Sequence, residues 1–194
     1  MEGNVTKNFS WKEVLHSNTA ISRGISNEPT PEHRENLEAL FTNIIQPLRE
    51  KWGAPLKINS TYRSPELNTA IGGSKTSAHV QGLACDIEPY DQSRTEEFGV
   101  FCVSEMQGGI LDDIDQLIYE FPDKEGNPRW MHIGYRKGSL ENKPRKSILL
   151  AVKEGGRTVY KNLTKEIAEK YNIDLEEARE EGVEDAAICT HCGK

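Results

Sequence analysis

Apolar residues recur at three- and four-residue spacing between Pro31 and about Lys51, which is the pattern of one face of an α-helix. Thr30 can cap this helix, and Pro31 suits its first position. Pro47 lies inside the stripe and has no backbone N–H, so we expect the helix to bend or restart there. The stripe must cover another element and consists of Leu37, Leu40, Ile44, Ile45 and Leu48.

Shorter segments alternate between apolar and polar residues or are continuously apolar, and these predict strands. They span 56–60, 83–87, 114–121, 129–135, 147–152 and 158–160. Polar or glycine-rich loops join the third to the fourth and the fifth to the sixth, which favours two antiparallel hairpins. Short helices are expected at 9–14, with Ser10 and Glu13 as a capping box, and at 65–70, and a longer one at 91–107 capped at Ser93. The sequence thus predicts an α+β fold, a small and mainly antiparallel sheet with helices packed on one face.

The chain divides into a main domain over 1–163 and a helical C-terminal appendage over 164–194. The appendage ends in Cys189-x-x-Cys192, which offers two thiolates where a structural zinc site needs four ligands. A half-site completed by another chain is one interpretation, and a flexible reduced tail is the one we favour. Cys85 and Cys102 lie in apolar surroundings and are expected to be small core residues.

Composition excludes several classes of protein. Apolar residues at 36% and charged residues at 28% are typical of a folded soluble chain. The net charge of −7 disfavours nucleic acid as a partner. No apolar run is long enough to span a membrane, and the N-terminus lacks the pattern of a secretory signal. We therefore expect a monomer that is cytoplasmic when synthesised.

Three residues could hold a metal ion. His79, Asp86 and His132 supply two imidazoles and a carboxylate, a mixture that Zn²⁺ accepts while keeping a fourth position open. Asp86 stands in an apolar run, where a buried charge needs a partner such as a metal ion. Ordinary hydrogen bonds at strand ends are the alternative interpretation.

Motifs surround these residues in chain order: STYRSP at 60–65, SxHxxGxAxD at 77–86 and WxH at 130–132. Together they resemble the zinc D-alanyl-D-alanine carboxypeptidases and phage endolysin peptidases, the LAS-type metallopeptidases related to VanX-type dipeptidases and the hedgehog domain. The similarity covers roughly 8–163. It implies a fold of the hedgehog/D-Ala-D-Ala-peptidase type and one Zn²⁺ per chain, bound by His79, Asp86 and His132. It also implies that Arg63 reads a substrate carboxylate or carbonyl.

The general base departs from the pattern of the resembling enzymes. They carry a carboxylate three residues before the second histidine, but here that position is Arg129, which cannot accept a proton. Pairing of 114–121 with 129–135 would put Glu120 beside His132, and apolar neighbours could raise its pKa, so Glu120 is our candidate base. Asp115 is the alternative. Glu88 could orient a ligand imidazole from behind.

The resemblance implies a zinc-dependent peptidase that hydrolyses amide bonds in peptidoglycan stem peptides, as a D-Ala-D-Ala carboxypeptidase or a cell-wall endopeptidase. Arg63 would bind the substrate's carboxylate or stabilise the oxyanion, and Ser77 could add a hydrogen bond. Phage-type release, or incorporation into a virion, would bring a chain without a secretory signal to the cell wall. The competing hypothesis is a non-catalytic zinc-containing module that binds the wall or builds a virion, and Arg129 is its best support.

Overall fold

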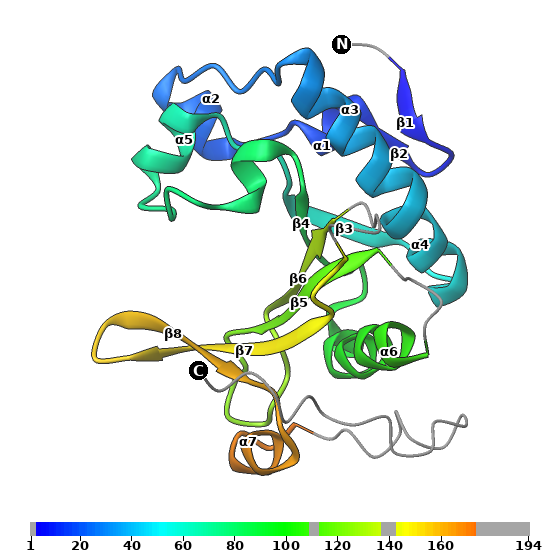
Figure 1. Cartoon of the computed structure of the whole chain (residues 1–194), viewed down its shortest axis with the longest axis vertical. Coiled ribbons are helices and arrows are strands. Elements are labelled where there is room, and N and C mark those ends of the chain that lie inside the picture. The colour runs from blue at the N-terminus through cyan, green and yellow to red at the C-terminus, as the bar shows by residue number, and fades with distance from the viewer. Residues whose placement is uncertain (1–2, 109–112, 137–142, 174–194) are drawn as a thin grey trace.

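A six-stranded sheet forms the centre of the protein (Figure 1). The computed structural model describes residues 3–108, 113–136 and 143–173. Neighbouring strands are antiparallel except for the fifth and seventh in the chain, which pair in parallel. The predicted α+β class with a mainly antiparallel sheet is therefore confirmed. The strand order across the sheet is β3 (Leu56–Ser60), β4 (Ala84–Pro89), β6 (Trp130–Tyr135), β5 (Ile114–Glu120), β7 (Ser147–Glu154) and β8 (Arg157–Asn162).

The long N-terminal helix is continuous but not uniform. Its first part, α3 (Pro31–Leu40), is capped by the Thr30 hydroxyl, as predicted. A π-helical segment, η1 (Phe41–Ile45), follows, and α4 (Gln46–Trp52) completes the helix. The wider turn precedes Pro47, whose ring would clash with the carbonyl four residues earlier in a regular α-helix. The irregularity expected at this proline is therefore a change of winding within one helix, and all five residues of the apolar stripe are buried.

Two further helices contribute to the same core as the sheet. The helix α6 (Thr95–Gln107) contacts β4, β5 and β6. Gly99 lets α6 lie close to β5, since a Cβ added at Gly99 would come within 2.5 Å of the buried Tyr119 ring. The short helix α7 (Lys165–Lys170) follows β8, and Ala168 and Ile173 belong to the core cluster.

The remaining elements are short. A hairpin of β1 (Asn4–Thr6) and β2 (Phe9–Ser10) opens the described chain. The others are α1 (Trp11–Val14), α2 (Asn18–Arg23), α5 (Pro65–Ala70), the 3₁₀ turn η2 (Ala78–Gln81) and the 3₁₀ turn η3 (Gln92–Arg94). The capping box at Ser10 and Glu13 is confirmed. The expected cap at Ser93 is wrong, because the Asp91 carboxylate caps η3 by accepting from the N–H and hydroxyl of Ser93, and α6 begins only at Thr95.

Side chains alternate across the sheet and give it two different faces. Cys85, Ile87, Tyr119 and Leu150 are buried in the apolar core beneath the helices. The residues between them point to the opposite face, where the polar groups lie. Cys102 is buried as well, so both of the expected core cysteines are free thiols inside the protein.

Parts of the predicted organisation lie outside the described residues. These include residues 174–194 of the expected helical appendage, with the Cys189-x-x-Cys192 motif. In the described part of the chain, no helix has both the length and the apolar character needed to cross a bilayer.

Candidate metal centre

Backbone groups of two neighbouring segments fix the position of His79. It lies in η2, which ends at Gly82 in the left-handed region with φ of 71°. A Cβ at Gly82 would come within 2.6 Å of the His33 carbonyl oxygen in α3, so glycine lets this turn pack against the helix. The Nδ1 atom of His79 lies 2.6 Å from the carbonyl oxygen of Thr61. Because a carbonyl only accepts, Nδ1 carries the proton and the lone pair of Nε2 is free.

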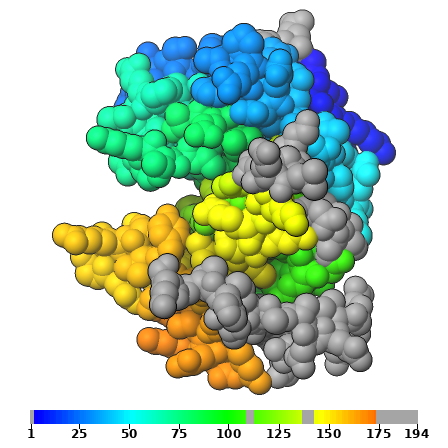
Figure 2. Space-filling view, viewed as in Figure 1, coloured from blue at the N-terminus to red at the C-terminus, as the bar shows by residue number. Residues whose placement is uncertain are grey.

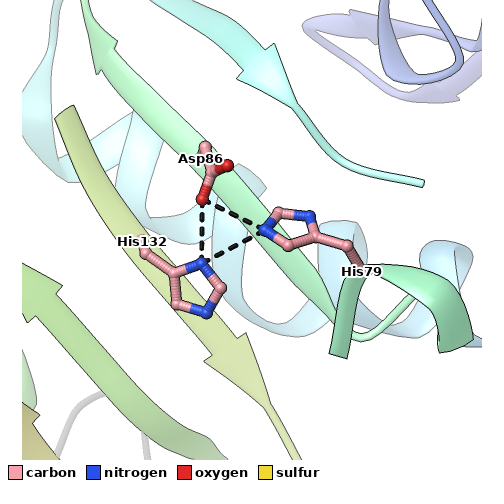
Figure 3. Close-up of side chains that lie close together, drawn as sticks. All are labelled: His79, Asp86 and His132. Carbon is pink, nitrogen blue, oxygen red and sulfur yellow. Dashed lines mark hydrogen bonds and ion pairs between the residues drawn. The ribbon is translucent and has the colours of Figure 1, made fainter. Parts of the chain in front are cut away.

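Asp86 and His132 are brought together by strand pairing. They are direct partners in the antiparallel register of β4 and β6, and both are buried. The Oδ1 atom of Asp86 lies 2.8 Å from Nδ1 of His132 and 3.2 Å from Nε2 of His79. The two imidazole nitrogens are 3.2 Å apart. Figure 3 shows the three side chains converging from β4, β6 and η2.

The triangle formed by these three atoms has the size that a zinc ion requires. Its edges are 2.8, 3.2 and 3.2 Å. Ligands about 2.0–2.1 Å from a tetrahedral zinc ion stand about 3.3 Å apart, and catalytic zinc sites use three protein ligands. Two nitrogens and one oxygen are also donors that zinc accepts. The residues therefore fit a zinc ion in both spacing and chemistry.

The charge of Asp86 is balanced within the protein. Its Oδ2 atom accepts a hydrogen bond from Nη2 of Arg63 at 2.7 Å, while Nε of Arg63 donates to the Ser60 hydroxyl at 2.8 Å. Burial alone would raise the pKa of Asp86, but the charge and hydrogen bonds of the two histidines lower it below its usual value. Burial lowers the pKa of His79. At neutral pH the cluster thus contains a carboxylate and at least one neutral imidazole, the forms that bind metal.

The family model for Peptidase M15 matches residues 7–113, more than half of the 194-residue chain. The chain belongs to the peptidase M15 family. No curated protein matches it significantly. His79 and Asp86 of this M15 peptidase lie inside the matched segment, whereas Glu120 and His132 follow it in the chain.

Glu120 lies on the same face of the sheet as this cluster. In the pairing of β5 with β6, Glu120 stands opposite Trp130, and Ile118 stands opposite His132, so Glu120 is a diagonal neighbour of His132. Burial raises the pKa of Glu120 to about 7, and repulsion by Asp86 adds to this, whereas His132 and Arg63 act in the opposite direction. The buried indole N–H of Trp130 has no hydrogen-bond partner within 3.5 Å. It lies near Glu120 and favours the ionised carboxylate, which lowers the pKa of Glu120. Glu120 can therefore exchange a proton near neutral pH.

Asp115, the alternative base, has other partners. Its carboxylate lies 2.6 Å from Nη2 of Arg145 and 2.9 Å from Nε of Arg136. Burial alone would raise the pKa of Asp115, but the hydrogen bonds and charge of Arg145 outweigh this and lower it. A carboxylate paired with two guanidinium groups is a weak proton acceptor, which favours Glu120 as the base.

Glu88 and Ser77, which were also expected to contribute to the site, make no hydrogen bond to the metal-binding residues. Glu88 makes no hydrogen bond to either histidine in the described chain: it pairs with Nζ of Lys57 at 2.7 Å and accepts from Gln92, which argues against the expected orienting role. The Thr61 carbonyl orients His79 instead, and a backbone group of this kind leaves no signal in the sequence. The Ser77 side chain precedes η2 without capping it and makes no hydrogen bond to the described residues.

Sequence reasoning missed Tyr160. It stands opposite Ala151 in β7, and Ala151 stands opposite Glu120 in β5, so Tyr160 shares the face and the row of Glu120. The β7–β8 hairpin forms one wall of a cleft whose other wall contains α5, as Figure 2 shows. The alternation along β8 could have placed Tyr160 on one face, but only the parallel pairing of β5 with β7 shows which side chains it approaches.

Proposed function

We propose that this M15 peptidase is a zinc-dependent hydrolase of amide bonds in peptidoglycan stem peptides. The observation that carries the proposal is the convergence of three buried ligand atoms from His79, Asp86 and His132. Glu120 supports it, since it lies on the same face with a pKa raised to about 7. A proton acceptor beside a metal cluster is what metal-assisted hydrolysis requires.

In this proposal His79, Asp86 and His132 hold the zinc ion. Zinc bound there would polarise the scissile carbonyl and lower the pKa of water from about 15.7 to about 7. Glu120 accepts the proton that the attacking water loses and then gives it to the leaving amine. Its strand is paired on both sides, which fixes the backbone from which the carboxylate extends.

Arg63 and Ser77 have positioning and binding roles in the proposal. Arg63 uses Nε and Nη2 for Ser60 and Asp86, and through these bonds it fixes the orientation of a metal ligand. A guanidinium has five N–H groups, so donors remain for a substrate carboxylate or for the oxyanion. The Ser77 hydroxyl, which has no partner in the described chain, would donate a further hydrogen bond to the substrate.

The substrate range follows from the family and not from the site alone. A D-Ala-D-Ala carboxypeptidase and a cell-wall endopeptidase use the same zinc chemistry and differ in how far the substrate extends beyond the scissile bond. Delivery to the wall by phage-type release, or as a component of a virion, is part of the same proposal.

The test is to incubate the purified zinc-loaded protein with muropeptides and to count newly formed amine and carboxyl ends. We expect release by the wild type and a loss of activity in Glu120→Ala with bound zinc unchanged. Glu35→Ala is the matched control, because Glu35 is an exposed carboxylate of α3. Full activity in Glu120→Ala would refute the assignment of the base.

A binding module is the second candidate function, and Arg129 is the observation that favours it. The position at which the resembling enzymes carry a carboxylate here holds an exposed guanidinium. A zinc-loaded wild type that sediments with purified cell walls and releases no new ends would establish this function instead.

A further inference from the structure

A polar groove of about 560 Å³ continues the metal-binding face of the sheet. Glu88 and Trp130 line it, and each lies two positions from a residue of the cluster, Asp86 in β4 and His132 in β6. Residues two apart in a strand are separated by about 6.6–6.8 Å. We call this space the Arg129 groove, and its other lining residues include Lys57, Asn59, Asn127 and Arg129.

The acidic groups in the Arg129 groove already have partners. Glu88 pairs with Nζ of Lys57 at 2.7 Å, and Asp123 accepts hydrogen bonds from the side chain and backbone N–H of Asn127. Arg129 has no carboxylate partner among the described residues. Its guanidinium instead lies over the Trp130 ring, 5.3 Å from the centroid. Lys57 and Glu88 balance each other, and the hydrogen bonds of Asp123 hold its carboxylate on the 123–127 loop, so Arg129 is the cation of the lining that has no ion-pair partner among the described residues.

We propose that the Arg129 groove binds a free carboxylate of the peptide substrate, carried about two residues away from the hydrolysed bond. This inference rests on the proposed function. An extended peptide advances about 3.3–3.6 Å per residue, so a substrate centred on the cluster reaches the groove with its second residue. A guanidinium binds a carboxylate through two parallel hydrogen bonds, and stacking on an indole ring holds its plane.

The groove gives a physical reason for the unusual residue before the second histidine. Because Glu120 on β5 can act as the base, the residue at position 129 need not be a carboxylate and can bind the substrate instead. Arginine at this place would select acidic substrates and reject their amides, because an amide brings no charge to the guanidinium.

The experiment uses two synthetic stem peptides that differ only at one side-chain carboxylate, which is free in one and amidated in the other. We measure kcat/KM with the zinc-loaded enzyme and binding of both peptides by calorimetry. The wild type should prefer the acid, and Arg129→Ala should lower the ratio of acid to amide about tenfold. Arg129→Glu should reverse the preference. Arg49→Ala, which removes a guanidinium from α4, should keep the wild-type ratio.

The outcomes separate this inference from the proposed function. Hydrolysis of both peptides with equal binding and equal kcat/KM would overturn the role of Arg129 and leave the peptidase intact. Preferential binding of the acid without hydrolysis would support the groove and overturn the enzymatic function. A ratio that is the same in the wild type and in Arg129→Ala would overturn the groove whatever the activity.

A second inference comes from the β7–β8 hairpin, which forms one wall of the cleft (Figure 2). Tyr160 shares a row across the sheet with Ala151 and Glu120, and only the small side chain of Ala151 separates the other two. Tyr160 is 57% exposed as a residue, and its hydroxyl makes no hydrogen bond to the described residues. Its pKa is raised by partial burial and by the charges of Glu120 and Asp86, so the phenol keeps its proton at neutral pH.

We infer that the Tyr160 hydroxyl donates a hydrogen bond to the carbonyl oxygen of the scissile amide, where negative charge develops during attack. This inference also rests on the proposed function. No group of the described chain competes for the hydroxyl, so its proton is available to the substrate.

Tyr160→Phe tests this role because it removes one oxygen atom and little else. Loss of a donor to a developing oxyanion lowers kcat about 10²- to 10³-fold, and we expect KM and the melting temperature to stay close to wild type. Tyr90→Phe is the control, because Tyr90 is an exposed tyrosine at the end of β4. An active wild type with an equally active Tyr160→Phe would overturn this inference alone, whereas an inactive wild type would overturn the peptidase as well.

Discussion

Zinc should stabilise this protein against unfolding, because the folded chain holds three ligand atoms together that the unfolded chain disperses. The cluster of His79, Asp86 and His132 is already assembled, with its atoms 2.8–3.2 Å apart. Binding therefore requires little rearrangement, and the binding free energy adds to the free energy of unfolding.

The size of the effect follows from the affinity and from the length of the chain. At a zinc concentration 1,000 times the dissociation constant, one site adds about 4.1 kcal/mol. A protein of this size gains about 2–4 °C in melting temperature for each kcal/mol. Saturating zinc should therefore raise the melting temperature by about 8–16 °C relative to the chelator-treated protein.

Differential scanning fluorimetry over a zinc titration measures this shift. His132→Ala leaves two of the three ligands and should lose most of it, whereas His33→Ala removes a histidine of α3 outside the cluster and should keep it. Because thiols also bind zinc, the titration is repeated with Cys189→Ser and Cys192→Ser combined. Magnesium, which prefers all-oxygen sites, should give little change.

Two results would refute the reasoning. A zinc-induced shift in His132→Ala as large as in the wild type would place the ion elsewhere. Loss of the shift in the double cysteine variant would place it at the C-terminal CxxC motif.

Three further predictions concern the base, its titration and the core. Glu120→Gln should lower kcat about 10²- to 10⁴-fold and leave bound zinc at one equivalent, as measured by steady-state kinetics and metal analysis. Because a base must be ionised and Glu120 has a pKa of about 7 without metal, kcat/KM should fall as the pH decreases through its pKa, and the nearby zinc cation should move this limb below pH 7 in a pH–rate profile. Gly99→Ala would place a methyl group 2.5 Å from the buried Tyr119 ring and should lower the free energy of unfolding by about 1–3 kcal/mol in urea titrations, whereas unchanged stability would show that α6 can move away from β5.

Much of the secondary structure could be predicted from the sequence because its signals are local. The strand over 56–60 and the helix over 65–70 have the predicted bounds, and the cap at Thr30 is confirmed. Alternation along 114–121 and 129–135 also placed Glu120 and His132 on one face. These predictions use periods of two or 3.6 residues, which neighbouring residues determine.

The contacts between distant segments could not be predicted in the same way. Periodicity does not show that β7 pairs in parallel with β5, and that pairing is what brings Tyr160 toward Glu120. Nor does it show that Arg63 binds Asp86, or that a backbone carbonyl orients His79. Both the order of the strands and the partners of buried charges depend on tertiary packing. The ion pairs and hydrogen bonds of the site could therefore be assigned only from the structure.

The π-helical segment before Pro47 has a consequence for relatives of different length. A turn of this kind, in which the Gln46 N–H binds the Phe41 carbonyl, contains one residue more than regular winding would use. Deleting one residue there would restore regular winding and leave the segments on either side facing as before, whereas deleting one residue elsewhere in the helix would rotate everything that precedes it by about 100° relative to α4. A one-residue change of length should therefore be tolerated better at this point than elsewhere in the helix, which makes the segment a place to look for an ancestral insertion.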